Sequence, residues 1–205
     1  MTTVEIFSIV KDIALAGAAC TTAYVAFTGL EKWQKELSGK ASFDVARELA
    51  KSIYFLRDEI RYCRSPFASA HEFPDKYREG FFNKHTPQEN GDAWAYVYAK
   101  RWESVAEALQ SFDLATLEAE ALWGEEIKKR SLELQQCVKS LRVDVDTFIR
   151  NEFSGGEIFE DKNLASKVQN GVWDVKPEEN ELTQKINTAI DALEIVIRPH
   201  LSRNI

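Results

Sequence analysis

The stretch from Ile13 to Leu30 contains eighteen consecutive residues without a charged side chain, whereas the rest of the chain is rich in charge. A helix of this length is about 27 Å long, close to the ~30 Å hydrocarbon core of a bilayer. Trp33 and Lys35 follow within about one turn, where interfacial anchors are expected. The sequence therefore predicts a membrane anchor helix within residues 1–37.

The basic residues around this stretch are distributed unequally. Only Lys11 precedes it, whereas five basic residues follow closely: Lys32, Lys35, Lys40, Arg47 and Lys51. Because positive residues are retained on the cytoplasmic side, a single-pass topology is predicted. The N-terminus is then outside, and residues 38–205 form a cytoplasmic domain.

The composition of the stretch leaves other interpretations open, because alanine and threonine outnumber leucine and isoleucine. It could be the buried central helix of a water-soluble bundle, or a cleaved signal or lipoprotein segment ending near Cys20. In a membrane, small residues spaced four apart allow helices to approach closely. This spacing predicts an oligomer face, made of Ala14, Gly17, Ala18, Thr21 and Thr22.

The remainder of the chain shows apolar residues at alternating steps of three and four, the signature of packed helices. We expect an all-α protein, a long-helix bundle or coiled-coil-like hairpin whose first helix continues from the anchor to Arg64. Loops are expected near residues 65–91 and 154–176. The apolar seams are Ala46, Leu49, Ile53, Leu56, Ile60 and Cys63; Trp94, Tyr98, Trp102, Val105, Leu109 and Phe112; Ile127, Ser131, Leu134, Val138, Leu141, Val145 and Phe148; and Leu182, Ile186, Ile190, Leu193 and Ile197.

Finer boundaries follow from local signals. The third helix is expected to begin near Asp92, and Asn170-Gly171 to form a turn before an extended piece from 172 to 175. Pro177 is expected to open the last helix, and Pro199 to close it.

Composition restricts the function. A formal net charge of −7 argues against a nucleic-acid partner. Three widely spaced cysteines, Cys20, Cys63 and Cys137, fit a reducing compartment, and the three histidines show no metal-ligand spacing. No phosphate loop or nucleophile motif is present, so no cofactor, metal or catalytic residue is predicted.

Arg57, Arg61 and Arg64 share one helix face because they are spaced at i, i+4 and i+7. Such a row suits phosphate, carboxylate or an acidic partner. The alternative is pairing within the bundle, because residues 113–126 contain five acidic residues and no basic one.

The predicted loop after residue 65 carries too many aromatic residues for a disordered segment. The rings either cap the open end of the bundle or form a partner-binding surface. They are Phe67, Phe73, Tyr77, Phe81 and Phe82.

Several segments together resemble a group of uncharacterised bacterial proteins with one N-terminal transmembrane helix and an all-helical cytoplasmic domain. The resemblance implies a bacterial origin and this topology, and no activity. The segments are Gly29 to Lys40, Ala46-Arg47, Arg57 to Arg61, Arg64 to Phe67, Leu122 to Glu125 and Ile197 to Leu201.

The leading functional hypothesis is a non-enzymatic single-pass inner-membrane protein whose bundle binds a protein partner or assembles with itself, with the lipid bilayer as a further partner. A second is an oligomeric pore-forming stress or phage-defence effector, with Thr21, Thr22 and Thr28 lining a polar path. A third is an enzyme that grips an anionic substrate through the arginine row.

Overall fold

A computed structural model describes residues 3–79 and 85–201, with the backbone alone for residues 3–10, 12 and 13. Within these ranges all regular secondary structure is helical, which confirms the all-α prediction. Two 3₁₀ turns, at Ala70–Glu72 and Glu157–Glu160, accompany the α-helices. These are α1 (Thr3–Cys63), α2 (Asp75–Glu79), α3 (Pro87–Trp123), α4 (Glu125–Phe153), α5 (Lys162–Val172) and α6 (Glu181–Leu201).

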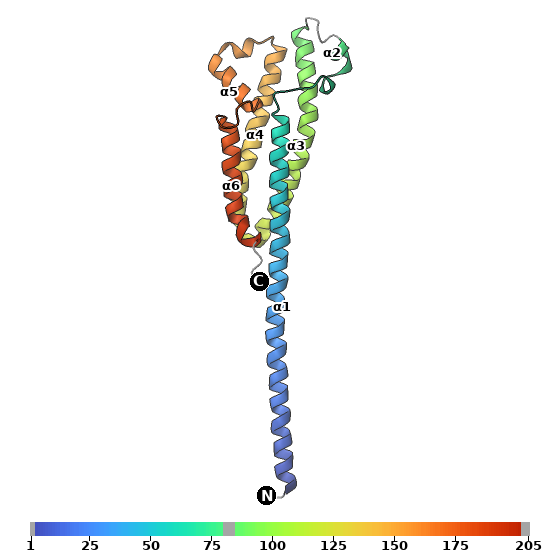
Figure 1. Ribbon diagram of the computed structural model, residues 1–205, viewed down its shortest axis with the longest axis vertical. Coiled ribbons are helices and arrows are strands. Elements are labelled where there is room, and N and C mark those ends of the chain that lie inside the picture. The colour runs from blue at the N-terminus through green and yellow to red at the C-terminus, as the bar shows by residue number, and fades with distance from the viewer. Residues whose placement is uncertain (1–2, 80–84, 202–205) are drawn as a thin grey trace.

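Four helices form an antiparallel bundle (Figure 1). The last part of α1 packs between α3 and α6, and α4 closes the ring on the opposite side. We call the end that holds the C-terminus of α1, together with α2 and α5, the distal end of the bundle. The proximal end is the one from which the N-terminal part of α1 emerges.

The predicted seams of α1, α4 and α6 are all buried, because each turns one narrow apolar face toward the bundle axis. In α3 the predicted stripe is only partly correct. Tyr98, Val105 and Phe112 are buried, whereas Trp94, Trp102 and Leu109 are half-buried at its edges. Small residues share the interior of α3, since this helix packs against both α1 and α4.

The third helix begins earlier than Asp92, at Pro87, because a capping box precedes it. The Thr86 hydroxyl accepts a hydrogen bond from the Glu89 amide (3.3 Å), and the Glu89 carboxylate accepts one from the Thr86 amide (2.8 Å). This reciprocal pair satisfies two free amides of the first turn.

The predictions for the second loop are wrong in detail. α5 continues through Asn170-Gly171 to Val172, because the backbone of Gly171 lies against Asp144, where a Cβ would collide. The last helix begins at Glu181, after Asn180, whose side-chain oxygen accepts the Thr183 amide (3.1 Å). Pro199 lies inside α6 rather than after it.

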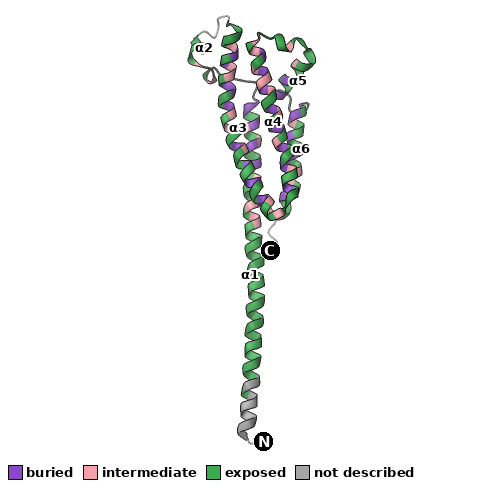
Figure 2. Ribbon diagram, turned by 180° about the vertical axis from the view of Figure 1, so that it is seen from behind, coloured by how far each residue is buried: buried purple, intermediate pink, exposed green. Residues whose placement is uncertain are grey.

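The N-terminal part of α1 projects from the proximal end as a single helix (Figure 2). Every residue from Ala14 to Ala41 is exposed, and Gly39 does not interrupt the helix. The alternative that this stretch is the buried centre of the bundle is therefore wrong. We call residues 14–41 the projecting helix.

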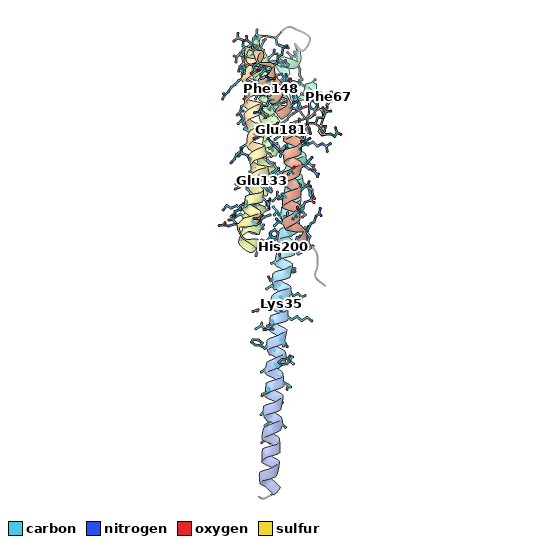
Figure 3. All side chains as sticks on the ribbon, turned by 90° about the vertical axis from the view of Figure 1, so that its left-hand side faces the viewer. Lys35, Phe67, Glu133, Phe148, Glu181 and His200 are labelled. Carbon is cyan, nitrogen blue, oxygen red and sulfur yellow. The ribbon has the colours of Figure 1, made fainter. Side chains whose placement is uncertain are left out.

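A hydrogen-bond chain joins three helices where the projecting helix meets the bundle. The Trp123 indole donates to the Ser42 hydroxyl (3.0 Å), which lies 2.9 Å from Nδ1 of His200. The His200 ring stacks on Trp123 with the centroids 4.1 Å apart, at the proximal end labelled in Figure 3. Ser42 thus fixes α1 to α3 and α6 at this point.

Two glycines in helices are expected to respond oppositely to alanine. Gly91→Ala should lower the free energy of unfolding by about 1–3 kcal/mol, because the new methyl group collides with the Phe153 ring. Gly39→Ala should not lower it, since nothing lies within 4 Å and alanine favours helix. Denaturant unfolding followed by circular dichroism measures both; equal losses would contradict the packing at Gly91.

Candidate functional site

The three threonine hydroxyls of the projecting helix donate hydrogen bonds to carbonyl oxygens of their own helix. The hydroxyls of Thr21 and Thr22 donate to the carbonyl oxygens of Gly17 and Ala18, each at 2.8 Å. Thr28 donates in the same way to the carbonyl oxygen of Tyr24 (2.9 Å). Threonine bonded in this way needs no water to satisfy its donor.

The five residues of the predicted oligomer face, Ala14, Gly17, Ala18, Thr21 and Thr22, are all exposed on the projecting helix. None of the described helices combines the length and the apolar character needed to cross a membrane.

The three arginines of the predicted row have three different environments. Arg57 pairs with Asp58 at 2.8 Å and lies over the Tyr54 ring. Arg61 is exposed and makes no hydrogen bond or ion pair with any described residue. Arg64 is only 1% exposed. A shared helix face therefore did not give the three side chains a shared role.

Arg64 holds the segment around the end of α5. Its Nε donates to the carbonyl oxygen of Gly171 (2.8 Å), and its Nη2 donates to the side-chain oxygen of Asn180 (2.8 Å) and the carbonyl oxygen of Asn170 (3.0 Å). Its Nη1 donates to the Thr183 hydroxyl (2.7 Å). Burial lowers the pKa of the guanidinium, and the Asp174 carboxylate, 3.9 Å from Nη2, opposes this shift.

Pairing of the arginine row with the acids of residues 113–126 does not occur in the described structure. Because α3 runs antiparallel to α1, those acids lie toward the proximal end, away from the row. They find nearby partners instead: Glu120 pairs with Lys128 and Glu126 with Arg130, both at 2.9 Å.

Arg101 is a second buried arginine, which the sequence analysis did not identify. Its Nε donates to the Glu72 carboxylate (2.6 Å), and its two other nitrogens donate to the carbonyl oxygens of Ser65 (2.9 Å) and Phe67 (2.8 Å). A signal was present, since Arg101 lies four residues from both Val97 and Val105 on the buried face. A charged residue on such a seam is rarely unpaired.

Two of the predicted loop aromatics pack onto the bundle. Phe73 is buried, with its ring centroid 5.2 Å from those of Tyr77 and Trp94. Tyr77 stacks on His85 at 4.1 Å and donates its hydroxyl to Asn90. This is the arrangement expected of a cap. Phe81 and Phe82 lie outside the described residues.

Phe67 differs from these rings, because its side chain is 85% exposed. It lies at the outer edge of the bundle (Figure 3). Its backbone is nevertheless held firmly, since Arg101 binds the Phe67 carbonyl oxygen and the Ser65 hydroxyl lies 3.2 Å from the same oxygen.

An open pocket of about 480 Å³ lies beside the end of α1; we call it the distal pocket. Two of its charged residues are compensated, Asp58 by Arg57 and Asp174 by Arg64. The guanidinium of Arg61 has no such partner among the described residues. The lining includes Asp58, Arg61, Tyr62, Arg64, Pro66 and Asp174.

Metal-binding groups and buried thiols were candidates for chemistry among the described residues. No group of three histidine, cysteine, aspartate or glutamate side chains among them could hold a metal ion. Burial raises the pKa of the Cys63 thiol to about 11 and also raises that of Cys137. Both thiols are therefore poor nucleophiles at neutral pH.

The described structure defines a class of protein by its shape: an antiparallel four-helix bundle with one helix projecting from its proximal end. Comparison with protein-family models, curated proteins and solved structures finds no match to this chain.

Proposed function

We propose that this chain is a non-enzymatic, single-pass protein of the bacterial inner membrane whose helical bundle lies in the cytoplasm and binds a protein partner or further copies of itself. The projecting helix supplies the anchor, and the bundle supplies the binding surface. The bacterial address and the topology rest on the family resemblance and on the distribution of basic residues.

The exposure of the projecting helix is the observation that carries the proposal. Its large apolar side chains are each more than half exposed, although burying one such side chain is worth about 1.5–3 kcal/mol. A lipid environment would cover all of them at once. They include Leu15, Tyr24, Val25, Phe27 and Leu30.

The hydrogen bonding of the projecting helix is compatible with lipid. Backbone donors are satisfied within the helix, and the hydroxyls of Thr21, Thr22 and Thr28 donate to helix carbonyls. On the C-terminal side of the uncharged stretch, the first charged residue is Glu31. Lys35 follows and extends outward below the bundle (Figure 3). The uncharged segment and its flanking charges thus follow the order that a membrane span requires.

The pore-forming alternative receives no specific support. The hydroxyls of Thr21, Thr22 and Thr28 donate to their own helix and would offer a polar path only their acceptor lone pairs. We therefore keep the tethered binding module as the proposal.

Carbonate-washed membrane fractionation tests the anchor. The full chain is expected in the membrane pellet, and a chain that begins at Ser42 in the supernatant. Ala23→Arg should move the full chain to the supernatant, because arginine at a helix centre costs about 2.5–3.5 kcal/mol on insertion. Ala41→Arg, equally exposed but outside the uncharged stretch, should leave it in the pellet. Recovery of the full chain in the supernatant would contradict the proposal.

A further inference from the structure

We propose that the distal pocket, with the neighbouring Phe67, is a docking surface for a protein segment that carries a carboxylate side chain beside an apolar one. This inference rests on the proposed function for the identity of the bundle as a binding module. It adds the chemistry that the partner must present.

The charge of the distal pocket selects an anion. Asp58 is compensated by Arg57 at 2.8 Å, and Asp174 by the buried Arg64. Arg61, the remaining charged residue of the pocket lining, has no partner among the described residues. Arg57 lies outside the lining but neutralises Asp58 from its edge. Counted with Arg57, three arginines face two aspartates, which leaves one positive charge, that of Arg61, although the chain as a whole is acidic.

A guanidinium such as that of Arg61 recognises carboxylates by two parallel hydrogen bonds. Its exposure means that it retains most of its hydration in the free protein, so that binding to a carboxylate replaces water. A neutral or basic side chain would gain no comparable contact.

The apolar part of the surface is formed by side chains that are unusually exposed. Tyr62 is 52% exposed and Phe67 85% exposed, on either side of Pro66 in the loop that leaves α1. Aromatic residues of this kind often provide the main binding energy of protein interfaces. Together they favour an apolar side chain next to the carboxylate.

The backbone that presents these residues is fixed before any partner binds. Arg101 binds the carbonyl oxygens of Ser65 and Phe67, and it is itself buried and paired with Glu72. On the other wall, the Asp174 amide donates to the carbonyl oxygen of Arg64 (3.0 Å). A preformed surface loses little conformational entropy on binding, which favours recognition of a short segment.

Two peptides that differ only in charge provide the test: acetyl-Leu-Asp-amide and its neutral analogue acetyl-Leu-Asn-amide. Each is titrated into the ¹⁵N-labelled full chain in detergent micelles, and the backbone amide signals of Tyr62, Ser65 and Phe67 are followed by nuclear magnetic resonance. We expect the acidic peptide to shift these signals and to bind about tenfold more tightly than the neutral one.

Variants localise the effect. Arg61→Gln should reduce the affinity for the acidic peptide to that for the neutral one. Arg47→Gln, at an exposed and paired arginine of α1 that lies outside the pocket lining, should leave it unchanged. Phe67→Ala should weaken both peptides, since it removes the apolar contact. Both substituted arginines lie outside the core, so the dispersion of the spectrum should be retained.

The inference is overturned if neither peptide shifts the signals, if both bind equally, or if Arg61→Gln leaves the preference for the acidic peptide intact. These outcomes are independent of fractionation. A membrane-bound chain that ignores the acidic peptide contradicts the docking surface alone. A chain in the supernatant that binds it contradicts only the membrane address.

Discussion

Arg64→Met is expected to lower the free energy of unfolding by about 3–5 kcal/mol, the cost of removing one member of a buried charged network. Methionine fills much of the same space but donates no hydrogen bond. Asp174 would lose its countercharge, and the side-chain oxygen of Asn180 and the carbonyl oxygens of Asn170 and Gly171 would lose a donor. Denaturant unfolding of the full chain, followed by circular dichroism, measures the change.

The other two arginines of the row are matched controls for this substitution. Arg57→Met and Arg61→Met should each change the free energy of unfolding by no more than about 0.5 kcal/mol, because both side chains are accessible to solvent. Similar losses for all three variants would mean that the row stabilises the helix as a unit, and would contradict the distinct environments described above.

Arg101→Met is expected to have an effect of similar size, about 3–5 kcal/mol, and to free the chain between Ser65 and Phe73. The substitution removes the guanidinium donor from the Glu72 carboxylate and from the carbonyl oxygens of Ser65 and Phe67. Faster amide hydrogen exchange across residues 65–73 would show the local loss, whereas Arg130→Met, a solvent-exposed pair on α4, should leave exchange there unchanged.

The Arg101 variant should also change the dependence of stability on pH. The hydrogen bond from Arg101 lowers the pKa of Glu72, so the ionised carboxylate binds more favourably in the folded chain. That contribution is present above the unfolded pKa of about 4.3 and is lost as pH falls through the lower folded pKa.

Stability of the unsubstituted chain should therefore decline below about pH 4.3 more steeply than that of Arg101→Met. Burial raises the pKa of Asp144 and Glu152, which contributes in the opposite direction in both proteins. The difference between the two pH profiles isolates Glu72. Parallel profiles would contradict the pairing.

The helices of the bundle could be predicted because their apolar residues repeat with helical spacing. Every residue of the predicted seam from Ile127 to Phe148 is buried, as is every residue of the predicted seams in the last part of α1 and in α6. The end of α5 near Gly171 and the start of α6 at Glu181 could not be predicted. They depend on contacts with Asp144 and Arg64, which come from distant parts of the chain. Tertiary contacts overrode local turn signals there.

The sequence predicted which residue types the candidate site contains, but not how their side chains are arranged. Spacing identified Arg57, Arg61 and Arg64 as neighbours on one face, but periodicity contains no information on which side chain α5 will cover. The spacing of Arg101 from Val97 and Val105 indicates a buried position but not its partners. Those partners, and the exposure of Phe67, depend on how the loop after α1 folds back onto α3.

Because α1 is unbroken, it fixes the distance between the uncharged stretch and the distal pocket. The same helix contains the end of the uncharged stretch, Leu30, and the pocket residue Arg61, with no break between them. At 1.5 Å per residue these positions are on the order of 45 Å apart. Ser42 also fixes the helix where it enters the bundle, so this distance is set by the length of the helix. Under the proposed membrane anchoring, a partner confined close to the headgroups would not reach Arg61, whereas one that extends about 45 Å from the bilayer would.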